Sequence, residues 1–237
     1  MDIFANNRGL WASPEAQRFK IHYWKNIETV IRIKDKIVAC GYHAANRVKA
    51  NYYMVHATKD VKNGRYFQFN QAMFQYADPV KMPTPKTGTY VLSVGTKHKN
   101  HMLCKGIKNL VISTNPRYKE KGGKFPKATV IYHTAPNDYG KYLDVLAKAR
   151  VVVIPVKKHK GLAAGITTVV DAIAMNKWVV TNEDLSDYIT HGKNGYIVEP
   201  SEFKDAVDAA KEPENDIDLS YTACLDRIGG VCANLSR

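Results

Sequence analysis

Short apolar runs alternate with stretches of helical spacing through the second half of the sequence. The runs lie at residues 89–95, 110–113, 128–133, 151–155, 178–181 and 195–198. The helical stretches cover about 138–149 and 167–175, and a third begins at Ser201. Strands that alternate with helices form parallel sheets with right-handed crossovers. Val151–Ile154 is apolar throughout, as expected of a strand covered on both faces. The pattern therefore predicts a Rossmann-type, doubly wound parallel α/β sheet.

A proline-rich segment precedes this region. Three prolines fall between Pro79 and Pro85, where neither a helix nor a central strand accommodates them. We expect a stiff linker there, which divides the chain into a reduced α/β N-terminal lobe with its linker (1–86) and a C-terminal domain (87–237). Apolar spacing in the lobe predicts a helix at 21–33, strands at 36–41 and 52–56, and a helix at 69–76.

Charge is unevenly distributed along the chain, whose formal net charge is +13. Residues 87–161 contain 15 Lys/Arg and 3 Asp/Glu, whereas residues 162–237 contain 6 and 13. A surface without a charged partner would mix the two signs. This segregation indicates a polyanionic partner such as nucleic acid, an anionic membrane or a phosphorylated substrate. A basic surface that serves only solubility is the alternative.

Several classes of protein are disfavoured by what the sequence lacks. No apolar run approaches the roughly 20 residues of a transmembrane helix, and the first residues do not resemble a secretory signal. The four cysteines show no CxxC spacing, and the eight histidines are scattered. GxSxG and GxGxxG motifs are absent. We therefore expect a cytoplasmic protein with no metal and no permanently bound cofactor.

Two segments at the predicted carboxyl edge of the sheet suit an anionic ligand. Small residues in Gly161–Thr168 would let a diphosphate approach the N–H groups of a helix N-terminus. Asp171 follows one turn later, where it could bind a ribose. Lysines in Gly95–His101 could neutralise a departing phosphate. An ordinary capped turn, a solvated helix acid and a solvated basic loop are the respective alternatives.

A further basic group lies near this edge. It consists of Lys157, Lys158 and Lys160, which belong to the loop of the small-residue turn. A broader basic region follows the second predicted strand of the domain, with members Arg117, Lys119, Lys121, Lys124 and Lys127. Basic residues near aromatic ones suit nucleic-acid backbones and exposed bases, although most of the aromatics are expected in the core.

Residues 139–200 resemble the C-terminal domain of GT-B glycosyltransferases of the family-4 type. The stretch 171–181, DAIAMNKWVVT, is similar to the family's Glu-Ala-Met-Ala-x-Gly-x-Pro-Val-Ile-x-Thr segment. The stretch 191–200, HGKNGYIVEP, is similar to its Asp-Gly-x-Asn-Gly-x-Leu-Val-x-Pro signature. Residues 91–95 resemble the strand and glycine that open the domain, so the resemblance covers about residues 88–211.

The resemblance implies a donor site. It places Gly165, Ile166, Thr167 and Thr168 at the diphosphate, Gly95, Lys97 and Lys99 near the phosphates, Asp171 at the ribose and His133 near the base. Lys99 would act catalytically on the phosphate of the leaving group. Three positions depart from the family pattern: its first glutamate falls on Ala163, its second is Asp171, and its usual arginine is Thr96.

The implied activity is transfer of a hexose or pentose from a nucleotide sugar, most simply a UDP-sugar, with retention and without a metal. Small basic enzymes of this kind resemble phage glycosyltransferases that modify hydroxymethylated bases, which makes duplex DNA the first acceptor and the host cytoplasm the location of a phage-encoded enzyme. Lys157, Lys158 and Lys160 would contact the acceptor. A glycan or lipid acceptor at a membrane surface, and a non-enzymatic nucleic-acid-binding protein on a decayed transferase fold, are the alternatives. Homo-oligomer formation stays open.

Overall fold

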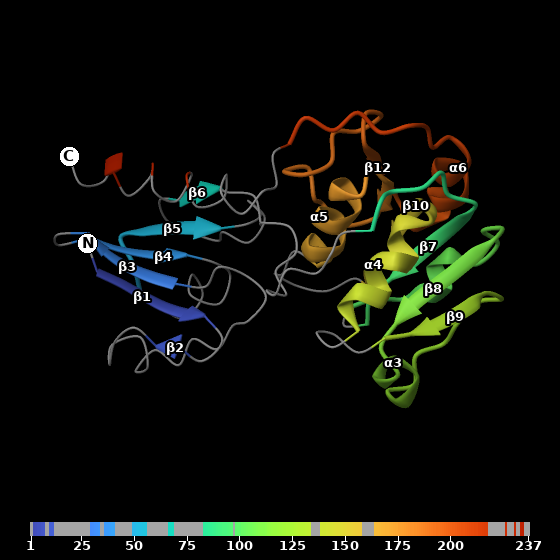
Figure 1. Cartoon of the computed structure of the whole chain (residues 1–237), viewed down its shortest axis with the longest axis horizontal. Helices are drawn as coiled ribbons and strands as arrows, with labels where there is room; N and C mark the ends of the chain where they lie inside the picture. Colours follow the sequence, from blue (N-terminus) through green and yellow to red (C-terminus); the bar gives the residue numbers. More distant parts are fainter. Residues whose placement is uncertain are drawn as a thin grey trace. The chain divides into compact units, whose positions relative to one another are not determined.

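The structure is a computed structural model (Figure 1), and its description covers defined parts of the chain. These parts are residues 2–7, 10–11, 29–33, 36–40, 49–55, 66–68, 83–96, 98–133, 138–157 and 164–217, with residues 226, 230, 233 and 234. The chain forms two compact units, one of residues 1–76 and 218–237 and the other of residues 77–217. The division predicted after residue 86 stays a prediction.

The described elements of the first unit form a six-stranded sheet in the order β2-β1-β3-β4-β5-β6. Neighbours from β2 to β4 pair antiparallel, and those from β4 to β6 pair parallel. The strands are β1 (Asp2–Asn7), β2 (Leu10–Trp11), β3 (Thr29–Ile33), β4 (Lys36–Cys40), β5 (Tyr52–Val55) and β6 (Tyr66–Gln68). Strands β4 and β5 confirm the predicted strands at 36–41 and 52–56.

The helix predicted over residues 21–33 is wrong where it can be checked. Thr29–Ile33 is strand β3, which pairs antiparallel with β1 and β4. The run TVIRI is rich in β-branched residues, which favour strands. Five residues are too few for the spacing of apolar positions to distinguish the helical period from the strand period. Residues 21–28 and the helix predicted at 69–76 lie outside the described residues.

The second unit contains a six-stranded, all-parallel sheet in the order β12-β11-β10-β7-β8-β9. Its strands are β7 (Tyr90–Val94), β8 (Leu110–Thr114), β9 (Thr129–Tyr132), β10 (Ala149–Ile154), β11 (Trp178–Thr181) and β12 (Gly195–Ile197). All six predicted strands of this region are confirmed. The order of the strands reverses between β7 and β10, as in Rossmann-type sheets.

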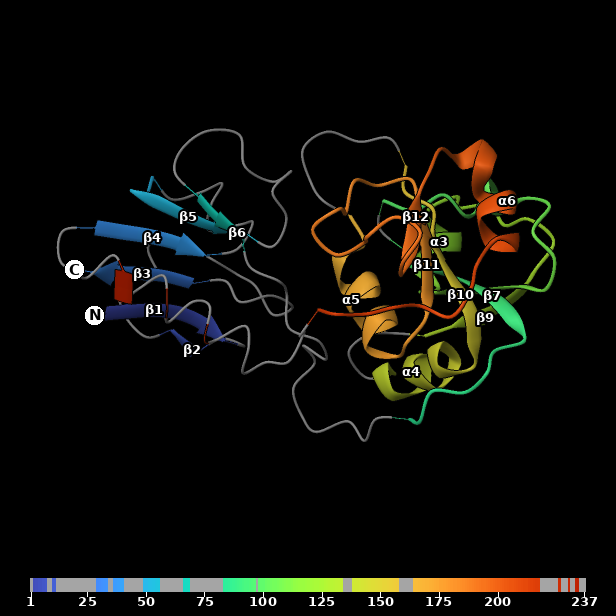
Figure 2. The ribbon, with the colours of Figure 1, turned by 90° about the horizontal axis from the view of Figure 1, so that it is seen from above.

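Helices cover both faces of this sheet. They are the 3₁₀ helices η2 (His101–Cys104) and η3 (Pro200–Glu202) and the α-helices α3 (Arg117–Glu120), α4 (Tyr139–Ala147), α5 (Ile166–Ala174) and α6 (Phe203–Asp208). Residues of η2 and α6 share a core cluster with Val151 and Val153 of β10. Side chains alternate along a strand, so Val152 and Ile154 face the opposite side, where α4 and α5 contact β10 and β11 (Figure 2). Both faces are therefore closed.

The closed faces leave the ends of the strands for ligands. In sheets of this order, the crevice lies at the carboxyl ends of the strands where the order reverses. Here that point lies beyond β7 and β10, between the loop that starts at Gly95 and the segment that starts at Pro155.

Candidate anion-binding site

The loop after β7 folds back against the segment after β10. The backbone N–H of Asn100 donates to the Pro155 carbonyl at 2.9 Å, and that of Lys157 donates to the His98 carbonyl at 2.8 Å. Lys99 lies between the two bonded positions of its loop. The pairing therefore holds Lys99 at the point where the strand order reverses.

The Lys99 side chain is buried between two glycine turns, with 4% of the residue's surface exposed. Its stem passes beside Gly95, where a Cβ would lie 3.0 Å from Lys99 Cγ. Its ammonium reaches Gly165, where a Cβ would lie 3.4 Å from Lys99 Nζ and 2.7 Å from Ile154 Cγ2. The φ angles of the two glycines are +114° and +108°, values that other residues rarely adopt. Close approach and backbone conformation thus both require glycine here.

The Lys99 ammonium is a buried cation without a protein counter-charge in the described part of the chain. Its side chain makes no hydrogen bond or ion pair there. Burial lowers its pKa from 10.5 to about 8, because removal from water disfavours the charged form. A bound anion would supply the missing acceptors and offset this cost.

The N-terminus of α5 begins beside this ammonium. Gly165 is the N-cap residue, and no side chain caps the helix or places an acid in its first turn. The N–H groups of a first helical turn lack intrahelical acceptors, and the helix dipole adds positive potential. Two independent sources of positive charge therefore meet at Gly165, in a geometry that suits an oxyanion.

Two side chains fix the Gly95 turn. Thr114 Oγ1 donates to the Gly95 carbonyl at 2.8 Å, and His101 Nε2 donates to the same oxygen at 2.9 Å. His101 Nδ1 therefore accepts from Ser93 Oγ at 2.8 Å. The pKa of His101 is lowered from 6.5 to about 4, mainly by burial and in smaller part by the charge of Lys99, while the hydrogen bond to Gly95 acts in the opposite direction. His101 is therefore a neutral positioning residue whose role the sequence did not indicate.

Asp171 belongs to a second group of side chains, on the α4 side of the sheet. Its Oδ1 accepts a hydrogen bond from the Tyr139 hydroxyl at 2.7 Å, and the residue is 1% exposed. The Tyr139 ring contacts Tyr142 at a centroid distance of 5.6 Å, and Tyr142 stacks on His133 at 5.3 Å. His133 Nδ1 bonds Ser113 Oγ at 2.8 Å. This series of contacts links α5, through α4, to the carboxyl ends of β8 and β9.

The predicted site residues fall into distinct groups. The structure brings together Gly95, Lys99 and Gly165. The first turn of α5 contains the buried Ile166 and the half-buried Thr167 and Thr168. Asp171 and His133 lie along the α4 side, and Lys157 is exposed after β10. Three predicted residues lie outside the described residues: Lys97, Lys158 and Lys160.

The described residues contain neither a candidate metal site nor a candidate membrane span. No group of three His, Cys, Asp or Glu side chains that could bind a metal ion occurs in these parts of the chain. No helix in the same parts has both the length and the apolar composition to span a bilayer. The site at Lys99 consists of a buried cation beside a helix N-terminus.

Comparison with known proteins gives little further information. No protein-family model matches the chain, and no curated protein matches it. A chain of the Glycosylation Associate Protein (Gap123) complex from Streptococcus agalactiae is structurally similar, with a TM-score of 0.39 and 12% sequence identity. The similarity covers 82% of this chain and 45% of that chain, which is less than half of the neighbour's length. A TM-score this low assigns neither a fold nor a function, so the Rossmann-like assignment rests on the strand order.

Proposed function

We propose that the chain is a GT-B-type glycosyltransferase that binds a nucleotide sugar at the carboxyl edge of its parallel sheet. The observation that carries this proposal is the buried Lys99 ammonium beside Gly165, without a counter-charge among the described residues. A diphosphate would lie at the N-terminus of α5 and accept hydrogen bonds from Lys99. Low local polarity would strengthen both interactions.

The proposed transfer is a substitution at the anomeric carbon of the sugar. The bond between that carbon and the diphosphate oxygen breaks, and the acceptor oxygen forms a new bond to the same carbon and loses its proton. The nucleoside diphosphate leaves with the electron pair. Lys99 and the first N–H groups of α5 would stabilise the charge that develops on the departing oxygen. The family resemblance adds retention of configuration, independence from a metal and a UDP-sugar as the first donor to test.

The nucleoside would extend toward α4 in this proposal. His133 would lie near the base, and Asp171 near the ribose. Because Asp171 is 1% exposed and its Oδ1 accepts from Tyr139, a ribose hydroxyl would bind at Oδ2, displace the Tyr139 hydroxyl from Oδ1 or bind through that hydroxyl. Removal of that hydroxyl should therefore alter nucleotide affinity as well as stability.

For the acceptor we propose a polyanion, with hydroxymethylated bases of duplex DNA as the first candidate. The support is the formal net charge of +13 and the excess of basic residues in 87–161. A reacting base would have to be flipped out of the duplex or be approached through the major groove. Glycan or lipid acceptors at a membrane surface remain the competing assignment within this enzyme class.

A thermal-shift and hydrolysis screen tests the proposal. The protein is measured with UDP, GDP and their sugars, each with and without hydroxymethylated duplex DNA. We expect stabilisation by one nucleotide that Lys99→Met abolishes and the exposed control Lys193→Met retains. Nucleotide release that depends on DNA would identify the acceptor. Stabilisation without a response to DNA would move the acceptor to a glycan or lipid, and no response to any nucleotide would overturn the donor site.

A further inference from the structure

The exposed charges of the second unit are grouped by sign into two segments of the chain. Residues 105–127 carry one acid, Glu120, and seven exposed basic side chains: Lys105, Lys108, Arg117, Lys119, Lys121, Lys124 and Lys127. These residues surround β8 and lead into β9, which is one edge of the sheet. Residues 199–216 lead from β12, at the other edge, and carry seven exposed acids: Glu199, Glu202, Asp205, Asp208, Glu212, Glu214 and Asp216. The two blocks thus lead from opposite edges of the sheet, and η3 and α6 of the acidic block contact η2, which precedes the basic one.

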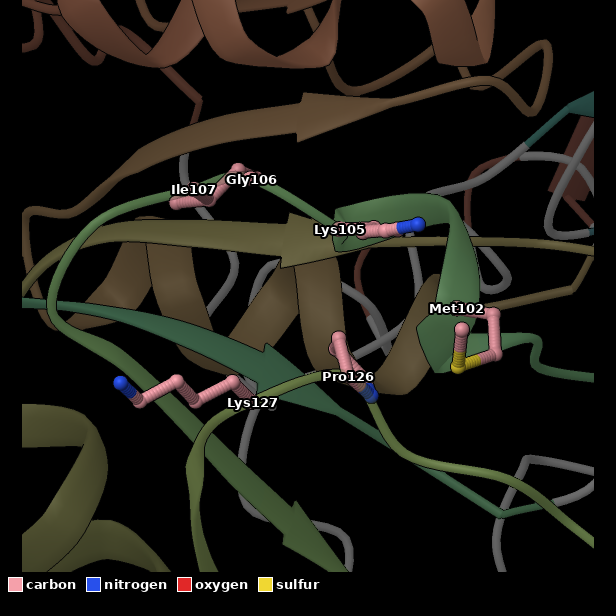
Figure 3. A pocket seen from close by; sticks show the side chains of 6 residues that line it. All are labelled: Met102, Lys105, Gly106, Ile107, Pro126 and Lys127. Atoms are coloured by element: carbon pink, nitrogen blue, oxygen red, sulfur yellow. The ribbon is translucent and has the colours of Figure 1, made fainter.

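A groove of about 520 Å³ lies within the basic side (Figure 3). The turn that connects η2 to β8 forms one wall, and the segment that leads into β9 forms the other. Figure 3 shows the ammonium groups of Lys105 and Lys127 pointing in different directions along the groove. Positive charge is thus distributed along it rather than focused on one point. The lining residues are Met102, Lys105, Gly106, Ile107, Pro126 and Lys127.

The seven basic side chains of this surface have no counter-charge of their own. None of them forms an ion pair or a side-chain hydrogen bond with a residue in the described ranges. Cations that are not neutralised internally leave their field available to a partner. The basic side chains form a strip that begins at α3 and ends at the groove. The partner that this strip fits therefore carries negative charge along a comparable length.

The surface lacks the features that other polyanions use. Single strands stack successive bases on several exposed aromatic rings, but Tyr118 is 5% exposed and packs against Phe125 and His101, which leaves Tyr132 of β9 as the one large exposed ring in the described ranges. Membrane surfaces favour exposed apolar side chains, and Tyr132 is the one large exposed hydrophobic residue in the described part of the chain. A duplex requires only cations placed along its phosphates.

We propose that this basic strip, from α3 to the groove at Lys105 and Lys127, binds the sugar–phosphate backbone of duplex DNA without sequence preference. The groove lies at the amino ends of β8 and β9, whereas Lys99 lies beyond the carboxyl end of β7. The groove end of the strip is therefore distinct from the proposed donor site, whereas its α3 end follows the carboxyl end of β8 beside the Gly95 loop, where the Asn115 N–H donates to Thr96 Oγ1 at 3.0 Å. The use of the strip in presenting DNA for transfer rests on the proposed function, but the binding itself requires no nucleotide.

The test is fluorescence anisotropy with a labelled 20-base-pair duplex of unmodified DNA across a salt series, without any nucleotide. The variant is Lys105→Gln/Lys124→Gln/Lys127→Gln. Its matched control is Lys193→Gln/Lys204→Gln/Lys211→Gln, which removes three exposed lysines from the acidic side. Both sets are exposed, and a thermal melt of each variant checks that the fold is retained.

We expect the first variant to lose affinity on the order of 100-fold at ~0.1 M salt and to lower the slope of log K against log salt by about 2 to 3. The control should bind like the unsubstituted protein. Equal binding by all three proteins, or equal loss in both variants, would overturn the assignment. Binding to phosphatidylserine vesicles through the same lysines, without duplex binding, would overturn the assignment and identify the surface as a membrane-binding one. Because Lys99 is unchanged, failure here leaves the donor site standing, and failure of nucleotide binding leaves this surface standing.

Discussion

Replacement of Lys99 by methionine should stabilise the second unit at neutral pH while it removes anion binding. Burial holds the Lys99 pKa at about 8 instead of 10.5. Each tenfold change in a protonation equilibrium is worth about 1.4 kcal/mol, so a charged ammonium at pH 7 costs about 3 kcal/mol of folding free energy. Methionine keeps an unbranched apolar stem beside Gly95 and carries no charge. The expected gain at pH 7 is therefore up to about 3 kcal/mol.

The gain has a defined pH dependence. Between pH 8 and pH 10.5 the unfolded chain holds the Lys99 proton and the folded chain does not, so the stability of the unsubstituted protein rises with pH in this window. Below pH 8 the cost is present in full, and above pH 10.5 it is absent. The stability difference between Lys99→Met and the unsubstituted protein should therefore be largest at pH 7 and disappear by about pH 10.5.

Urea denaturation followed by circular dichroism at pH 7, 8, 9, 10 and 10.5 measures this difference, with Lys193→Met as the exposed control. Calorimetry with inorganic pyrophosphate adds the binding readout, because pyrophosphate affinity should fall above pH 8 and vanish in Lys99→Met. A variant less stable than the unsubstituted protein at pH 7 would refute the reasoning. That result would mean that the buried charge is already compensated within the fold.

Three further outcomes test individual contacts. Gly165→Ala should lower stability by about 1–3 kcal/mol in a urea titration, because the new methyl group would lie 2.7 Å from Ile154 Cγ2 at a φ of +108°; unchanged stability would contradict this. Tyr139→Phe should cost about 1–3 kcal/mol by the same assay, because it removes a donor from the buried carboxylate of Asp171, whereas a neutral effect would mean that the bond contributes nothing. Burial raises the pKa of Cys104 to about 12, so mass spectrometry should find it alkylated by iodoacetamide at pH 8 far more slowly in the native protein than in urea. Equal rates would show that Cys104 is accessible.

The sequence predicted the second unit well because parallel strands are buried on both faces. Such strands need apolar residues at every position, and a run such as Val151–Ile154 is unlike any surface segment. The first unit is different because its strands pair in mixed directions. At Thr29–Ile33 the pairing with β1 and β4 decides the conformation. The spacing of apolar residues within this segment does not indicate which strands it pairs with.

The same limit applies to the site. Glycines and lysines at strand ends indicated where an anion would bind, but the sequence equally allowed a solvated loop at Lys99. Its burial depends on hydrogen bonds between residues 98–100 and 155–157, more than fifty positions apart. His101 at the start of η2 and Thr114 at the end of β8 hold the Gly95 carbonyl. Polar residues at and beyond the ends of adjacent strands were the available signal for them.

The two proposed sites use positive charge in physically different ways. Lys99 is a single buried cation whose charge lowers stability until an anion arrives, so it selects a small ligand that enters the crevice beside Gly165. The lysines around the groove remain in water, so their charges cost little folding free energy. They favour an extended row of phosphates over a single phosphate group. Salt screens exposed charges beyond about 10 Å at 0.1 M and buried ones much less. Rising ionic strength should therefore release duplex DNA before it releases pyrophosphate, because the charges that bind the duplex are exposed and Lys99 is buried.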